Sequence, residues 1–223
     1  MLGKQAECCF EYYLKQSSRY DLMAANLQIQ GVDQTLGELD YIVFDQKKKC
    51  TLHIELACKF YLYDPSVLND REANWIGANR KDTLTEKLDK LIDKQFPLLY
   101  NDQTKLKLKE LDIWVNTIEQ QLCLKAFLFI PKGHRKNDFS ETIRNCISGY
   151  WTSFSEFVSE RKEALYVVPK KKEWLLPPEK FEKWHVLSEV KATIGASINT
   201  KKSLLVYKKT KNKIERLFVV WWE

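Results

Sequence analysis

Three charged residues near the start of the chain have the types and spacing that could do hydrolytic chemistry. Asp40 stands at the beginning of one apolar run, and Glu55 and Lys59 stand two pleats apart in the next. Because side chains alternate across a strand, Glu55 and Lys59 would share one face, where each charge is costly to bury without a partner. If the two runs pair as a hairpin, we expect Asp40 and Glu55 to lie close together.

This combination of residues predicts the cleavage of phosphodiester bonds. Two carboxylates on adjacent strands can hold Mg²⁺ or Mn²⁺ through oxygen ligands and leave positions for water and a phosphate oxygen. A lysine on the same face can orient the attacking water and stabilise the charge that develops on the phosphate. Taken alone, the residues favour structural roles, in which Asp40 caps a turn, Glu55 and Lys59 form an ion pair, and His53 has no function.

The elements that must position these residues follow from the spacing of apolar side chains. Residues 2–15 repeat at about 3.6 residues per turn, which predicts an amphipathic helix. Three β-rich runs separated by turn-forming residues come next and predict a meander, at 22–30, 39–45 and 51–63. Asp82 or Thr83 is a candidate N-cap for a second helix, which extends to Leu99.

The rest of the chain extends this pattern. Residues 102–120 have a mixed or helical character, and 123–130, closed by Pro131, read as a buried strand. A helix is expected in 138–148, with short strands at 164–168, 203–208 and 214–222. We therefore expect an α/β fold of the α+β kind with a mixed sheet. It would form one domain, 1–223, with an αβββαβ core over about 1–131 and a β-rich C-terminal extension over about 132–223.

Composition and charge narrow the classes of function. The chain has 44% hydrophobic and 30% charged residues, enough for a packed core, and no apolar run near the roughly 18 residues that span a bilayer. We expect a cytoplasmic protein without membrane contact. The six Cys and three His show no zinc or disulfide spacing. The net charge is +6, and residues 161–223 hold 15 Lys or Arg against 7 Asp or Glu, which favours contact with phosphates.

The predicted αβββαβ order, with Asp40 and then Glu55-Leu56-Ala57-Cys58-Lys59, resembles the PD-(D/E)XK, restriction-endonuclease-like superfamily. More specifically, several segments are similar to the bacterial family Domain of Unknown Function 1853, namely 2–3 with Glu7, 26–28, 35–40, 54–62, 75–88, 125–129, 149–151, 174–175 and 217–220. The superfamily usually places its lysine two residues after the acid, where this chain has Ala57. Lys59 lies two residues further along the same strand face, and a long side chain could reach back.

The resemblance implies a Mg²⁺- or Mn²⁺-dependent nuclease that acts on nucleic acid, with DNA as the expected substrate. It implies Asp40 and Glu55 as metal ligands, Glu7 on the first helix as an accessory ligand, and Lys59 as the activator of water and phosphate. Further candidates for contact with phosphate are Arg80, Lys87 and Gln95. Without the resemblance, Glu7 would be an exposed helical residue, Arg80 a solvated loop residue, and Gln95 a partner of a backbone carbonyl.

The alternative function is a catalytically inactive protein with the nuclease fold that binds nucleic acid or serves in assembly. Some members of the superfamily have lost activity in this way, and Ala57 at the usual lysine position is compatible with such a loss. This alternative predicts salt-sensitive binding that needs no metal.

Overall fold

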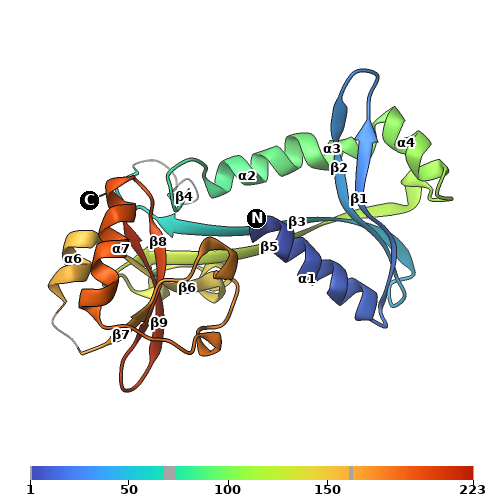
Figure 1. Cartoon of the computed structure of the whole chain (residues 1–223). Helices are drawn as coiled ribbons and strands as arrows, with labels where there is room; N and C mark the ends of the chain where they lie inside the picture. The colour runs from blue at the N-terminus through green and yellow to red at the C-terminus, as the bar shows by residue number, and fades with distance from the viewer. Residues whose placement is uncertain (1, 68–73, 161–162, 223) are drawn as a thin grey trace. The chain divides into compact units, whose positions relative to one another are not determined.

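The computed structural model describes residues 2–67, 74–160 and 163–222 (Figure 1). These residues group into two compact units that alternate along the chain. Unit 1 comprises the described residues of 1–2, 59–85 and 126–223, and unit 2 comprises 3–58 and 86–125. Two long strands, β3 and β5, contribute residues to both units. The expected division into a core and a C-terminal extension stays a prediction.

Nine strands of the described chain form a mixed sheet. Their bounds are β1 Tyr20–Gln30, β2 Thr35–Asp45, β3 Cys50–Tyr63, β4 Trp75–Gly77, β5 Ile118–Pro131, β6 Ile147–Ser153, β7 Leu165–Val167, β8 Leu204–Lys209 and β9 Ile214–Val220. The hydrogen-bonded order is β1-β2-β3-β5-β6-β9-β8-β7, and β4 pairs with β3. β1, β2 and β3 form an antiparallel meander, β6 is parallel to β5 and β9, and β7, β8 and β9 are antiparallel. The predicted mixed α/β class is confirmed.

The helical segments differ more from expectation than the strands do. They are α1 Leu2–Gln16, α2 Leu84–Lys90, a π-helical turn η1 Leu91–Gln95, α3 Phe96–Leu98, α4 Asp102–Lys109, α5 Glu141–Cys146, α6 Phe154–Ser159 and α7 Leu187–Asn199. Short 3₁₀ turns occupy Val115–Thr117, Lys136–Asp138, Lys171–Glu173 and Pro178–Lys180. The helix expected in 138–148 is only α5, because the chain enters β6 at Ile147. No helix within the described residues is long and apolar enough to cross a membrane.

Unit 2 packs helices on both faces of its part of the sheet (Figure 1). On one face, Leu14 of α1 packs with Tyr41 and Val43 of β2 and with Leu52 and Ile54 of β3. On the other face, a second cluster joins strands to the segment that follows α3, through Ile29, Leu39, Ile42, Leu99, Leu108, Ile113, Val115 and Ile118. Because alternate residues of β3 face α1, the odd-numbered residues between them, among them Glu55, face away from α1.

Unit 1 has an aromatic core. The rings of Phe129 and Phe218 meet edge to face with centroids 4.7 Å apart, and Trp174 packs edge-on against Phe218 at 5.2 Å. Such pairs add to the free energy gained by burying their area. A separate cluster holds α6 and α7 against β8 and β9, with Val190 and Ile194 of α7 buried in it.

Gly149 of β6 gives the sharpest test of this packing. A Cβ added to Gly149 would lie 2.0 Å from the carbonyl oxygen of Arg216 on β9, whereas a Cβ at Gly3 in α1 would meet no atom of the described residues within 4 Å. We expect Gly149→Ala to lower the free energy of unfolding by about 3 kcal/mol, because backbone must move. Gly3→Ala should change it by less than about 1 kcal/mol. Urea denaturation followed by tryptophan fluorescence measures both, and equal midpoints for the two variants would contradict this packing.

Candidate functional site

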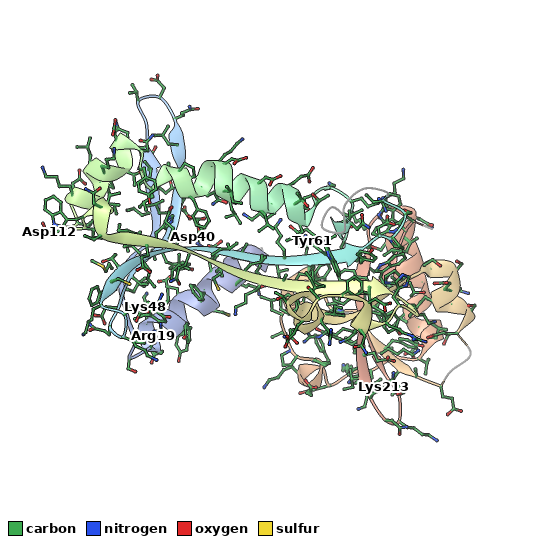
Figure 2. All side chains as sticks on the ribbon, turned by 180° about the vertical axis from the view of Figure 1, so that it is seen from behind. Arg19, Asp40, Lys48, Tyr61, Asp112 and Lys213 are labelled. Carbon is green, nitrogen blue, oxygen red and sulfur yellow. The ribbon has the colours of Figure 1, made fainter. Side chains whose placement is uncertain are left out.

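Asp40 lies where β2 and β3 stop pairing. The ladder between these strands ends at the pair Tyr41 and Ile54, and Asp40 is the residue of β2 that directly precedes Tyr41. Beyond that pair, the backbone N–H of Leu56 donates to Oδ2 of Asp40 at 2.7 Å. The carboxylate therefore takes the place of a backbone acceptor at the point where the strands part (Asp40 is labelled in Figure 2).

The surroundings of Asp40 disfavour its negative charge. Burial and, next in size, the charge of Glu55 raise the pKa of Asp40 to about 6, although the hydrogen bond from Leu56 lowers it in part. Asp40 accepts its hydrogen bond from the residue that follows Glu55 in the chain, so the two predicted carboxylates lie close enough for their charges to interact. Like charges in a partly buried place favour the uptake of a proton or a cation.

Glu55 is fully buried and both of its carboxylate oxygens are hydrogen-bonded. Oε1 lies 2.9 Å from Nε2 of His53, and Oε2 accepts a hydrogen bond of 2.8 Å from Nε2 of Gln95. The Nζ of Lys87 in turn donates to Oε1 of Gln95 at 3.2 Å. A buried carboxylate requires such donors because its desolvation is otherwise very costly.

The hydrogen-bonding roles of the two ring nitrogens of His53 follow from its other neighbour, Gln120. The side-chain nitrogen of Gln120 lies 2.8 Å from the carbonyl oxygen of Phe96 and 3.0 Å from Nδ1 of His53. Because a carbonyl oxygen only accepts, this contact orients the Gln120 amide, which then donates to Nδ1 as well. Nδ1 of His53 therefore accepts a hydrogen bond, and Nε2 donates one to Glu55.

The π-helical turn η1 aligns Lys87 with Gln95. These residues are eight positions apart, a spacing that rotates one of them by about 80° from the other around a regular α-helix. One α-helical turn followed by one wider π-helical turn takes about eight residues, so both side chains come to the same side. The second helix was predicted from the sequence, but this turn was not.

Glu7 makes contacts of a different kind. Its carboxylate pairs with Lys4 at 2.9 Å, and its backbone carbonyl accepts the hydroxyl of Tyr41 at 2.9 Å. Its charge is the smallest of the named contributions to the raised pKa of Asp40. Within residues 2–67, 74–160 and 163–222, no group of three or more His, Cys, Asp and Glu side chains is placed to hold a metal ion. The role of Glu7 as a ligand stays a prediction.

The two remaining candidates belong to unit 1. The ammonium of Lys59 pairs with Asp82 at 2.8 Å, with both side chains more than a third exposed. Arg80 has a positive φ of 56° and pairs with the buried carboxylate of Asp64 at 2.6 Å. Arg80 is therefore held in an ion pair, and it is not simply a solvated loop residue.

Sequence reasoning missed two members of the Glu55 network. His53 lies two residues before Glu55 on the same face of β3, but it was expected to have no role. Gln120 was not singled out. It is 67 positions from His53 and approaches it only because β5 lies beside β3.

Comparison with known families agrees with the more specific resemblance drawn from the sequence. The model of the family described as a domain of unknown function (DUF1853) matches residues 1–220. The chain belongs to the DUF1853 family. No curated protein and no solved structure matches it. For this DUF1853 protein, membership in the PD-(D/E)XK superfamily stays a prediction.

The raised pKa of Asp40 predicts a pH dependence of stability. Between its unfolded pKa near 3.8 and its folded pKa of about 6, the folded state holds a proton that the unfolded state releases. The free energy of unfolding should therefore fall as the pH rises from 4 to 6. In Asp40→Asn this loss should be smaller by about 1–2 kcal/mol, after allowance for solvent screening. Urea denaturation at each pH measures it; an unchanged slope, or an equal change in the exposed Asp93→Asn control, would contradict the assignment.

Gln120 and its neighbour Gln121 allow a matched test of the buried network. Gln120→Leu leaves Nδ1 of His53 and the carbonyl of Phe96 without their donor, so we expect the free energy of unfolding to fall by about 2–3 kcal/mol. Gln121→Leu makes the same chemical change at a half-buried position for which the structure records no side-chain hydrogen bond. It should cost less than about 1 kcal/mol. Equal losses in thermal or urea denaturation would argue against the network.

Proposed function

We propose that this DUF1853 protein is a divalent-metal-dependent phosphodiesterase that cleaves nucleic acid, with Asp40 and Glu55 as the carboxylates of its active site. The observation that carries the proposal is the approach of these two carboxylates where β2 and β3 part, with the pKa of Asp40 raised to about 6 by burial and by Glu55. Such a pair of charges is stabilised by a cation. The restriction-endonuclease-like core and DNA as the substrate are parts of the same proposal.

The donor atoms suit Mg²⁺ or Mn²⁺. Both ions prefer oxygen ligands, and Mg²⁺ commonly binds one or two carboxylates together with waters and substrate phosphates. Leu56 occupies Oδ2 of Asp40, while in the described part of the chain no donor is recorded for Oδ1. Each oxygen of Glu55 accepts one hydrogen bond and retains a second lone pair. When bound, the metal would polarise a phosphate oxygen and lower the pKa of a bound water.

The residues around the carboxylates have distinct tasks in this proposal. His53 and Gln95 hold the Glu55 carboxylate in one orientation, as outer partners of metal ligands commonly do. Lys87 supplies the cation that the superfamily pattern would place at position 57, and it is joined to Glu55 through Gln95. Its ammonium would stabilise the negative charge that develops on the phosphate.

Cleavage and metal binding test this function together. Wild-type protein is incubated with Mg²⁺ or Mn²⁺ and with single-stranded, double-stranded and branched DNA and RNA. Asp40→Asn and Glu55→Gln should abolish cleavage, and Lys87→Ala should lower the rate about 100-fold. Lys90→Ala, which removes an exposed lysine of α2, should leave the rate within about twofold. Lys59→Ala is included as well, because a loss in that variant alone would transfer the role from Lys87 to Lys59.

Calorimetry separates the metal site from the choice of substrate. Mg²⁺ or Mn²⁺ should bind the wild type and raise its melting temperature, because a ligand bound only by the folded state stabilises it. The Asp40→Ala/Glu55→Ala double variant should show neither effect. Absence of binding in the wild type would overturn the proposal whatever the substrate.

A second function, metal-independent binding of nucleic acid without cleavage, has its own support. Both oxygens of Glu55 are engaged within the protein, and the described residues hold no cluster of three metal-ligating side chains. Under this alternative, Glu55 serves only to bind His53 and Gln95, and Asp40 serves only as the acceptor for the Leu56 amide. Binding would be salt-sensitive and would persist in the Asp40→Ala/Glu55→Ala variant.

A further inference from the structure

Unit 1 contains a large cavity, and none of the residues that line it belongs to the proposed metal site. It has a volume of about 1220 Å³ and is lined only by residues of unit 1, from β5, β6, β8, β9 and the loops beside them. This volume exceeds the few hundred Å³ that a small ligand needs. Its described lining includes six Lys or Arg side chains and four Glu side chains, an excess of two positive charges.

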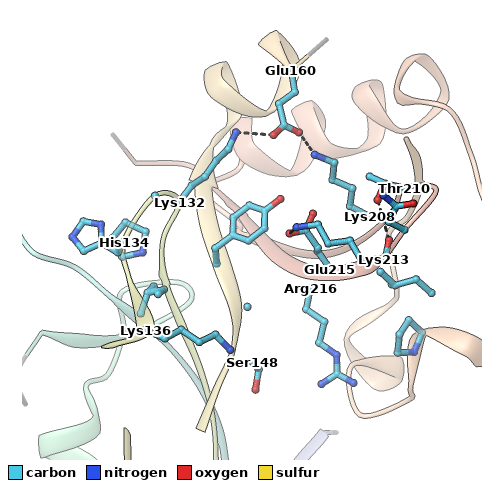
Figure 3. A pocket seen from close by; sticks show the side chains of 18 of the residues that line it. Lys132, His134, Lys136, Ser148, Glu160, Lys208, Thr210, Lys213, Glu215 and Arg216 are labelled. Carbon is cyan, nitrogen blue, oxygen red and sulfur yellow. Dashed lines mark hydrogen bonds and ion pairs between the residues drawn. The ribbon is translucent and has the colours of Figure 1, made fainter. Parts of the chain in front are cut away.

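At one end of the cavity the positive charges are already paired. Glu160 lies between Lys132 and Lys208, with Oε1 2.7 Å from Nζ of Lys132 and Oε2 in a short hydrogen bond with Nζ of Lys208 (Figure 3). Burial alone would raise the pKa of Glu160, but the two ammonium groups more than offset this effect and lower it. Lys208 is only 3% exposed. These lysines are therefore committed to an internal carboxylate.

At the other end, two cations lack a carboxylate partner. The Nζ of Lys136 donates to the carbonyl of Ile147 at 2.9 Å, and the guanidinium of Arg216 lies 5.6 Å from the ring centre of Tyr207. Neither takes part in a salt bridge within the described residues. Figure 3 shows the Lys136 and Arg216 side chains reaching the same end of the cavity, on either side of Ser148. An anion between them would be the missing partner.

The other lining groups suit a phosphate carried on a larger body. Arginine binds phosphate through paired N–H groups, and lysine adds a point charge. Burial raises the pKa of the Tyr150 hydroxyl, which therefore stays protonated as a possible donor. Pro177, Pro178 and Ile214 add apolar surface against which a ring could pack.

We propose that this cavity binds a phosphate-bearing small molecule of nucleotide size, with its phosphate held by Lys136 and Arg216. Free phosphate and nucleotide phosphate share the chemistry that this end of the cavity recognises. The volume favours the nucleotide, because a phosphate ion alone would leave most of the cavity to water. This site is independent of the proposed metal site, which uses residues of unit 2.

Calorimetry on the whole chain, in EDTA to remove divalent metal, tests the proposal with inorganic phosphate, pyrophosphate, adenosine monophosphate and adenosine as probes. Adenosine monophosphate should bind saturably and adenosine should not. Arg216→Gln and Lys136→Gln should each weaken binding about tenfold or more, as expected for the loss of a charged hydrogen bond. Lys191→Gln, an equal charge change on the exposed side of α7, should alter the affinity less than twofold.

The relative affinities of the probes show whether the ligand is a nucleotide or the phosphate group alone, and two outcomes would contradict the proposal. Tenfold tighter binding of adenosine monophosphate than of phosphate would support a nucleotide ligand, whereas equal affinities would support the phosphate group alone. The Asp40→Asn/Glu55→Gln variant should bind like the wild type, which separates this site from the proposed function. Absence of saturable binding for all three phosphate compounds, or an equal loss of affinity in Lys191→Gln, would overturn the proposal of a phosphate site in this cavity. If Arg216→Gln fails to fold, the exposed Lys136 still provides the test.

Discussion

The arrangement of unit 2 depends on one buried charge, the carboxylate of Glu55. A carboxylate removed from water must be surrounded by donors, and here His53 and Gln95 provide them from a strand and from a helix. Gln120 then fixes the imidazole of His53, and Lys87 fixes the amide of Gln95. The same hydrogen bonds that make the charge tolerable therefore hold β3, β5 and the helical segment from α2 to α3 together.

Asp40 adds a second carboxylate close to Glu55, whose burial is already costly in free energy. Its carboxylate satisfies the Leu56 amide at the end of the β2–β3 ladder, which is a structural task. The same position puts it within the electrostatic influence of Glu55 and raises its pKa. A fold that only needed an acceptor there could use a neutral side chain. The pair of acids is what makes this place chemically distinct from the rest of the sheet.

Charge is distributed differently in unit 1. Part of the basic excess of the C-terminal third is neutralised internally, since Lys208 pairs with Glu160 and Lys213 with Glu215. The basic residues of 161–223, whose excess over acidic residues favours contact with phosphates, are therefore not all available for it. Among the basic residues that line the cavity, Lys136 and Arg216 have no carboxylate partner within the described residues, and both lie at one end of the cavity. The buried aromatic side chains, among them Trp75 and Trp174, serve packing.

The family was recognised from the resemblance of particular segments, and repeating patterns in the sequence determined α1, the β1–β2–β3 meander and the start of the second helix. These elements depend on the local spacing of apolar and polar residues, which can be read directly from the sequence. α7 escaped prediction because its sequence is rich in β-branched residues and contains Gly195, so its helicity depends on packing Val190 and Ile194 against the sheet. Tertiary structure alone decided that Gln120 meets His53 and that Lys87 is joined to Glu55, whereas Lys59 pairs with Asp82. Such partnerships depend on strand adjacency and on the π-helical turn, and neither leaves a periodic signal in the chain.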